Sequence, residues 1–184
     1  MHRPFDAPGC ETITRMDAMA ETSVDDAIEA FWVRARNAAG IYPLEAVLGQ
    51  DEQMSLRPPV FSFGDSVEMA DWLCQLVIDG KKTATSSWRD MYSHEGAELP
   101  EVGELSIVCD GAGKPRVLLR LTAVETVSFA HAGPEIAAAE GEGTFEEWRE
   151  AHDAVFRHEC EEAGIEFDPN GDIVVEHFEA LYSL

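Results

Sequence analysis

Two of the three lysines in this 184-residue chain, Lys81 and Lys82, stand side by side and open a hydroxyl-rich stretch, residues 83–88. A charged lysine can hold an anion, and a lysine that burial drives to its neutral form can act as a base. Threonine and serine hydroxyls donate and accept hydrogen bonds and can act as nucleophiles. The stretch therefore indicates either a catalytic or anion-binding segment or a solvated turn between a helix and a strand.

The charge balance limits the partners of these lysines. The formal net charge is -23 and the pI is about 4.4, so the field of the molecule repels nucleic-acid backbones. Non-specific binding to long RNA or DNA depends on many Lys and Arg contacts with phosphates. We therefore expect no DNA partner, whereas a single nucleoside in a pocket stays compatible with the charge.

Composition and cysteine use indicate a cytoplasmic protein without a membrane segment. The hydrophobic fraction is 45%, and no apolar run approaches the ~20 residues of a membrane span. Residues 1–8 lack the basic and apolar regions of a signal peptide. The four cysteines are scattered and read as reduced thiols. His152, His158 and Cys160 have no zinc-ligand spacing, so we expect neither a metal nor a cofactor.

The chain divides into three parts. Residues 1–22 mix proline, glycine and charge, and are expected to be a disordered tail. Residues 23–60 are expected to form a helical extension and a linker, because Ile28, Phe31 and Trp32 lie on one face of a helix over 24–38. Residues 61–184 are expected to form the main domain.

In the main domain a helix is expected to start at about Asp65, where Glu68 completes a capping box. It is expected to end at Gly80, because glycine readily adopts the left-handed backbone conformation found just past a helix C-terminus. The Lys-Thr stretch therefore begins where the chain leaves this helix. On a straight strand Lys82 and Thr85 would point to opposite faces. Cooperation between them requires residues 81–85 to turn or bulge.

The remaining elements predict an α+β fold with a compact barrel. Strands are expected over 105–109 and 117–127, joined by a turn at 110–113, with Pro115 suited to a sheet edge. A short helix over 131–139, a helix from Thr144 to Ala163 and a last strand over 172–182 follow. His152 lies on the apolar face of the long helix, which favours a packed core histidine over a catalytic one.

Several short motifs occur together in a fixed order. They are Phe63-Gly64-Asp65, Gly80-Lys81-Lys82-Thr83-Ala84-Thr85, Val102-Gly103-Glu104, Ala139-Glu140-Gly141-Glu142-Gly143, Trp148-Arg149-Glu150-Ala151-His152 and Glu176-His177-Phe178-Glu179-Ala180-Leu181-Tyr182. In this order the motifs resemble the ASCH domain family over about residues 61–182. The resemblance implies a small PUA-like β-barrel flanked by helices, with a pocket beside the barrel.

The resemblance also implies a function, which differs between branches of the family. A shorter branch hydrolyses the acetyl amide of acetylcytidine with a lysine, a threonine and a glutamate that resemble Lys82, Thr85 and Glu142 by position. A longer branch, closer in its motifs to this chain, is associated with cleavage of single-stranded RNA, and other members are thought only to bind RNA. The chain departs from the family signature at Ser87, where the family has arginine; Arg89 lies two residues further on.

Three functions follow, with amide hydrolysis of an N-acylated cytosine-type nucleoside first. Thr85 would attack the acyl carbon or position a water to do so, and Lys82 would take the hydroxyl proton. Glu142 would relay that proton to the leaving amine or orient the lysine. The alternatives are a single-stranded RNA endoribonuclease and a domain that binds RNA or a modified nucleoside without chemistry. The expected partner is a nucleoside-type ligand or short single-stranded RNA, and a homodimer is compatible with the sequence. The residues expected to bind substrate are Lys81, Thr83, Ser86, Trp88, Tyr92 and Arg149.

Overall fold

The computed structural model describes residues 23–41 and 57–184. The expected tail over 1–22 and most of the expected linker lie outside these residues. The strands are β1 (Val60–Phe61), β2 (Ala84–Trp88), β3 (Leu105–Cys109), β4 (Pro115–Ser128) and β5 (Asp172–Ser183). The helices are α1 (Val24–Ala38), α3 (Val67–Ile78), α4 (Arg89–Glu95), α5 (Pro134–Glu140) and α6 (Phe145–Ala163), with a 3-10 turn η2 (Phe129–His131). None of these helices is long and apolar enough to cross a membrane.

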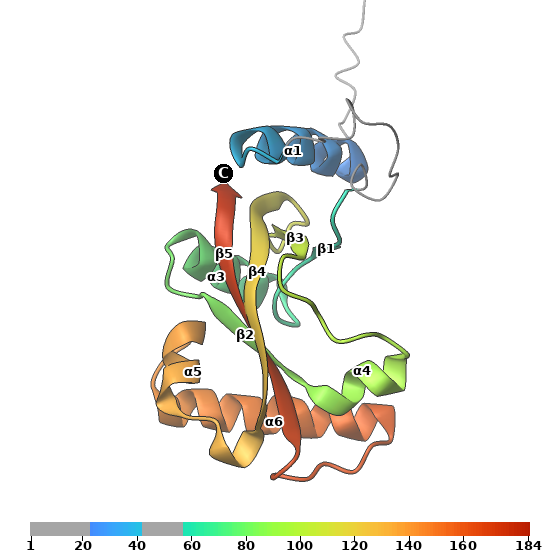
Figure 1. Cartoon of the computed structure of the whole chain (residues 1–184), viewed down its shortest axis with the longest axis vertical. Coiled ribbons are helices and arrows are strands. Elements are labelled where there is room, and N and C mark those ends of the chain that lie inside the picture. The colour runs from blue at the N-terminus through green and yellow to red at the C-terminus, as the bar shows by residue number, and fades with distance from the viewer. Residues whose placement is uncertain (1–22, 42–56) are drawn as a thin grey trace, which may run out of the picture.

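The five strands form one mixed sheet in the order β1-β3-β4-β5-β2 (Figure 1). The two long strands β4 and β5 are its antiparallel centre, and only β1 and β3 pair in parallel. Strand β2 pairs with the first half of β5, from Ala84 opposite His177 to Trp88 opposite Ile173. This sheet with surrounding helices confirms the α+β class, and it places the hydroxyl-rich stretch on the strand next to β5.

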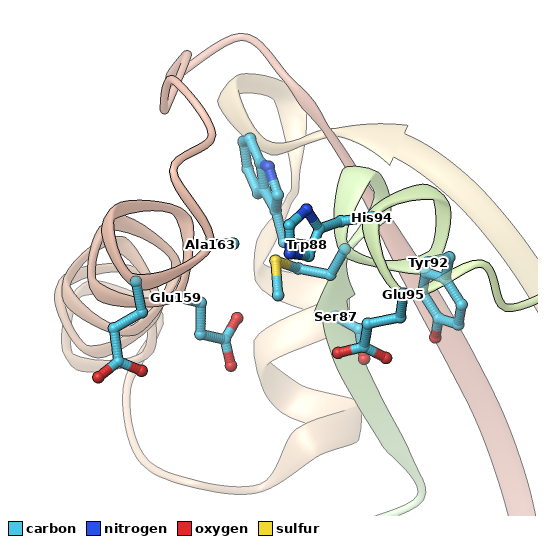
Figure 2. A pocket seen from close by; sticks show the side chains of 9 residues that line it. Ser87, Trp88, Tyr92, His94, Glu95, Glu159 and Ala163 are labelled. Atoms are coloured by element: carbon cyan, nitrogen blue, oxygen red, sulfur yellow. The ribbon is translucent and has the colours of Figure 1, made fainter.

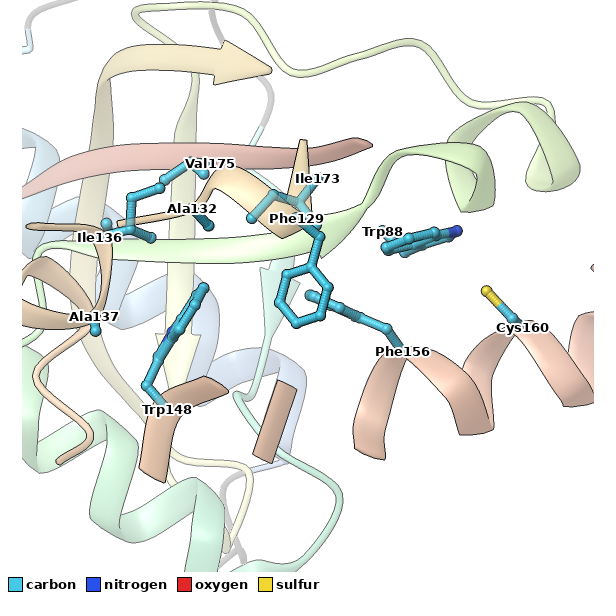
Figure 3. Close-up of a cluster of buried hydrophobic side chains, with 11 residues drawn as sticks. Trp88, Phe129, Ala132, Ile136, Ala137, Trp148, Phe156, Cys160, Ile173 and Val175 are labelled. Atoms are coloured by element: carbon cyan, nitrogen blue, oxygen red, sulfur yellow. The ribbon is translucent and has the colours of Figure 1, made fainter. Parts of the chain in front are cut away.

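One hydrophobic cluster joins α5, η2 and α6 to β2 and β5 (Figure 3). Trp88, Phe129, Trp148 and Phe156 are its large side chains, each at most 2% exposed. Helix α6 starts at a capping box, in which Thr144 and Glu147 exchange hydrogen bonds, and ends at Gly164 in the left-handed conformation. These are the bounds that the sequence predicts.

A second cluster lies under α3, and a third lies under α1. Helix α3 is capped by Ser66, whose side chain accepts a hydrogen bond from the backbone of Met69, so the predicted cap at Asp65 is one residue too early. Helix α1 covers the range that the sequence predicts, and its Phe31 and Trp32 pack with Ile107 and Leu118. The extension therefore shares a core with the sheet.

The sequence-based expectations differ from the structure at two places in this part of the fold: one expectation is wrong, and one helix was not expected. Pro115 starts β4, which lies between β3 and β5 and is not an edge strand. Proline is tolerated there because it is the first residue of the strand, opposite Cys109 at an irregularity in the ladder. Helix α4 was not predicted, because its seven residues bury no side chain fully and carry no apolar period.

We predict that Phe31→Ala lowers the free energy of unfolding by about 3–5 kcal/mol, because it empties a site that is 0% exposed between α1 and the sheet. Val33→Ala on the same helix is the control, since Val33 is 37% exposed. Urea unfolding of both variants measures the difference. Equal small losses would show that α1 contributes no core to the domain.

Candidate functional site

The backbone places Lys82 between a helix and a strand. The chain leaves α3 through Gly80, whose φ is +69°, and the backbone N–H of Lys82 donates to the carbonyl of Leu76 at 3.1 Å. The next N–H, of Thr83, donates to the carbonyl of Ala139 at the end of α5 at 2.7 Å. Strand β2 begins only at Ala84, so residues 81–83 turn before the strand starts.

Gly141 allows the end of α5 to approach this turn. Its φ is +69°, and a Cβ there would lie 2.4 Å from the carbonyl oxygen of Lys81. Any larger residue would therefore push the two segments apart. The close approach brings the carboxylates on either side of Gly141 next to the lysine.

Lys82 is 2% exposed and forms ion pairs with both carboxylates. Its Nζ donates to Glu140 Oε2 at 3.1 Å and to Glu142 Oε1 at 2.5 Å. The Glu140 side chain is 1% exposed, whereas that of Glu142 is 18% exposed. Lys82 is thus a buried cation between one enclosed carboxylate and one that solvent reaches.

Glu140 is the centre of a larger hydrogen-bond network. Its Oε1 accepts from Ser86 Oγ at 2.6 Å and from Trp148 Nε1 at 3.0 Å, while its Oε2 lies 3.5 Å from His152 Nε2. Burial opposes ionisation of Glu140, but the His152 hydrogen bond and the Lys82 charge outweigh it and lower its pKa to about 2. Glu140 is therefore an anion at neutral pH, and every partner around it is a donor.

His152 belongs to this network and is only partly a packed core histidine. Its Nδ1 lies 2.9 Å from the carbonyl oxygen of Trp148, and its ring stacks on the indole of Trp148 with centroids 4.5 Å apart. Burial opposes the charged ring, but the hydrogen bond and the charge of Glu140 outweigh it and raise the pKa of His152.

The carboxylates and the imidazole also form a group with metal-ligand geometry. One ligand atom from each of Glu140, Glu142 and His152 lies within 4.8 Å of the others. Lys82 Nζ contacts both carboxylates at this position. The protein therefore supplies its own cation where a metal ion would bind.

Thr85 lies on the other face of β2 from Ser86, because side chains alternate along a strand. It lines a cavity of about 40 Å³ with Phe63 and Glu176. Within the described residues no hydrogen bond joins Thr85 to Lys82 or Glu142. The ring of Phe63 links the two positions, since Lys82 Nζ lies 5.2 Å from its centroid. Lys82 and Glu142 are thus in contact, and Thr85 lies beside them across Phe63.

Two of the predicted substrate-binding residues belong to the ion-pair face of the site. Ser86 donates to Glu140, as described above, and Thr83 Oγ1 donates to the carbonyl of Ala139 at 3.2 Å. Lys81 is exposed and pairs with Asp79 at 3.2 Å. Thr83 and Lys81 thus have protein partners near the surface.

The other three predicted binding residues have structural contacts. Arg149 donates to the carbonyl of Phe129 and lies over its ring, 4.0 Å from the centroid. Trp88 is 2% exposed and packs in the core, so as placed it cannot stack a base. Tyr92 donates to Glu176 Oε1 at 3.1 Å. Of the three, only Tyr92 lies next to a residue of the Thr85 cavity.

Sequence reasoning missed Glu140 and Glu176 as site residues. Glu140 stands two residues before Glu142 in a motif that the sequence did identify, and Glu176 opens the last such motif. Membership of these motifs was the available signal. Nothing local in the sequence distinguishes the buried carboxylate from the accessible one.

A pocket much larger than the Thr85 cavity lies elsewhere, between α4 and α6, with a volume of about 550 Å³ (Figure 2). Carboxylates of Glu95, Glu159 and Glu162 line it, together with Met91 and Trp88. This acidic lining repels phosphate groups. We therefore place the candidate site at Lys82, where charge and burial are unusual, and not at this acidic pocket.

The comparisons agree with this fold. The ASCH domain family model matches residues 59–182, so the chain belongs to the ASCH domain family. The crystal structure of an ASCH domain from Lactobacillus crispatus JV V101 is 28% identical with a TM-score of 0.71, covering 84% of this chain and 94% of that one. The crystal structure of a protein from Enterococcus faecalis V583 is 34% identical in sequence and has a TM-score of 0.70. The match covers 84% of this chain and 87% of that one. No curated protein matches the chain.

We predict that Glu140→Gln lowers the free energy of unfolding at neutral pH by about 3–5 kcal/mol, because it removes one charge of a buried pair. Glu179→Gln is the control: Glu179 pairs with Arg120 at the surface, where both side chains are nearly half exposed. That control should cost less than about 1 kcal/mol. Comparable losses in urea unfolding would contradict the central place of Glu140.

The two shifted groups also predict a pH dependence of stability. The low pKa of Glu140 adds stability that is present above about 4.5 and lost as the pH falls toward about 2. The raised pKa of His152 adds stability that is complete below about 6.5 and lost as the pH rises through its folded-state value. His152→Gln should remove the loss on the alkaline side and, because His152 also lowers the pKa of Glu140, should reduce the loss on the acid side. Thermal unfolding midpoints measured from acid to alkaline pH report both losses of stability. If His152→Gln kept the alkaline-side loss unchanged, that loss could not be assigned to His152.

Proposed function

We propose that this protein hydrolyses the amide of an N-acylated cytosine-type nucleoside, with Lys82, Thr85 and Glu142 as its reacting groups. The observation that supports this most directly is the contact between Lys82 and Glu142 at 2.5 Å, with Lys82 Nζ 5.2 Å from the ring centroid of Phe63, which also lines the cavity of Thr85. Membership of a family associated with RNA binding and nucleic-acid-related substrates gives the substrate its general class.

In this proposal the proton moves in two steps. Lys82 first passes a proton to Glu142, its accessible partner, and becomes neutral. It then accepts the hydroxyl proton of Thr85 as the threonine oxygen attacks the acyl carbon, a step that requires Thr85 Oγ1 to come within hydrogen-bond reach of Lys82 Nζ, directly or through one water, when substrate is bound. The acyl group is held as an ester on Thr85 while the amine leaves, and water hydrolyses that ester. Glu140 stays ionised throughout and fixes the position of Lys82.

Two features favour a nucleoside over an RNA chain. The cations that would hold phosphates have other partners: Lys81 pairs with Asp79, and Arg149 is bound to the backbone and ring of Phe129. The net charge of -23 adds a general repulsion of polymer phosphates. The endoribonuclease remains the second candidate because the buried lysine and the threonine would suit either reaction.

We predict that acylated cytidine is turned over at nearly the same rate at low and moderate salt, because no counterions are released. Lys82→Ala and Thr85→Val should each remove nearly all activity, whereas Lys81→Ala should cost much less. Thr122→Val, at an exposed position on β4, is the control for the threonine substitution. Release of the carboxylic acid measures turnover for each variant.

The same variants are tested on single-stranded RNA. An RNA-cleaving protein would lose activity steeply with salt, roughly 10³-fold or more for several phosphate contacts. Lys81→Ala and Arg149→Ala would then weaken it about as much as Lys82→Ala. Salt-dependent RNA cleavage together with no turnover of the nucleoside would overturn the proposed function.

A further inference from the structure

A second carboxyl group shares the cavity with Thr85, and the proposed mechanism above does not use it. Glu176 lies on β5 directly opposite Thr85 in the antiparallel ladder. Side chains opposite one another share a face of the sheet, with Cβ atoms about 4.5–5.5 Å apart. Both residues line the 40 Å³ cavity. The side chains of Glu176 and Thr85 therefore lie beside each other in this cavity.

The size of the cavity limits what can enter it. A volume of about 40 Å³ is far below the ~300–1,000 Å³ of typical ligand pockets. Phe61, Phe63 and Phe178 form apolar walls around it, and Phe61 is 38% exposed at the rim. The space therefore admits the edge of a planar ligand and excludes a whole ring. In an N-acylated cytosine that edge carries the amide nitrogen.

The surroundings of Glu176 raise its pKa above that of a free glutamate. Burial is the main cause, and the charge of Glu104 adds to it, so the pKa of Glu176 is raised; the hydrogen bond from Tyr92 opposes the shift. The pKa of Tyr92 is raised to about 12, first by burial and then by the charge of Glu176, so its hydroxyl remains a donor at neutral pH. Strands β2 and β4 face Glu176 with the uncharged Thr85 and Val124.

We propose that Glu176 is a further catalytic residue, the acid that protonates the departing nitrogen when the acyl group is transferred to Thr85. Its place opposite Thr85 in one small cavity sets it beside the amide that Thr85 attacks. Glu142 is less suited to this role, because Lys82 Nζ already holds it at 2.5 Å. The inference rests on the proposed function and names the acid which that mechanism leaves open.

The step balances in atoms and charge. The carbon–nitrogen bond breaks, its electron pair stays on nitrogen, and nitrogen takes the proton of Glu176. The resulting carboxylate then takes a proton from the water that attacks the acyl-threonine ester. Thr85 regains its proton from Lys82 as the carboxylic acid leaves, and Glu142 returns its proton to Lys82. Hydrolysis of one amide by one water leaves every group as it began.

The test measures kcat against pH for N4-acetylcytidine with wild type, Glu176→Gln, Tyr92→Phe and the control Glu179→Gln. With Glu176 as the acid, wild-type kcat falls as the pH rises through the pKa of Glu176. Glu176→Gln lowers kcat about 10²–10⁴-fold and abolishes that limb. Tyr92→Phe removes a hydrogen bond that lowers the pKa of Glu176, so the limb moves to higher pH. Glu179→Gln keeps the wild-type profile.

The outcomes separate this inference from the proposed function. An active wild type with an unchanged rate and alkaline limb in Glu176→Gln overturns the inference and leaves the function standing. A wild type that does not hydrolyse the nucleoside overturns both. If Glu176→Gln fails to fold, Tyr92→Phe decides: an unmoved limb overturns the assignment, and a limb displaced to higher pH supports it.

Discussion

The structure depends on keeping one carboxylate, Glu140, ionised where no solvent reaches it. An unpaired charge in that position would cost several kcal/mol, a large share of the ~5–15 kcal/mol by which a domain is stable. The fold meets the requirement by bringing donors from three separate elements to one side chain. Lys82 comes from the turn before β2, Ser86 from β2 itself, and Trp148 and His152 from α6. The position of Lys82 therefore depends on how α5 and α6 pack against the sheet, because these helices carry Glu140, Trp148 and His152.

Strand β2 separates the site into two faces. Ser86 points to the buried ion-pair network, and Thr85 points to the small cavity with Glu176. The alternation of a strand makes this division unavoidable, since neighbouring residues cannot share a face. Phe63 lies between the faces and touches both, with its ring near Lys82 Nζ and its edge in the cavity wall. A charge held on one face can thus act on the groups that line the other.

Local sequence signals were enough for most of the fold. Apolar periods and caps located α1 and α6 to the residue, because a helix terminus depends on neighbours only three or four positions away. The same reasoning failed for α4, which has no apolar face, and for Glu140. A contact between Lys82 and a carboxylate 58 residues later leaves no local trace. The two glutamates around Gly141 have similar sequence surroundings, and only the assembled structure distinguishes them.

The order of the strands has a consequence for how the chain acquires its site. Strand β5 follows every other strand in the chain, yet it lies between β4 and β2. Until β5 is in place, β2 has no neighbour in the sheet, and Thr85 has no residue opposite it. Contacts of such long sequence separation form slowly. During synthesis the sheet would therefore exist first as β1, β3 and β4 alone, and β2, which carries Thr85, would become ordered only together with β5.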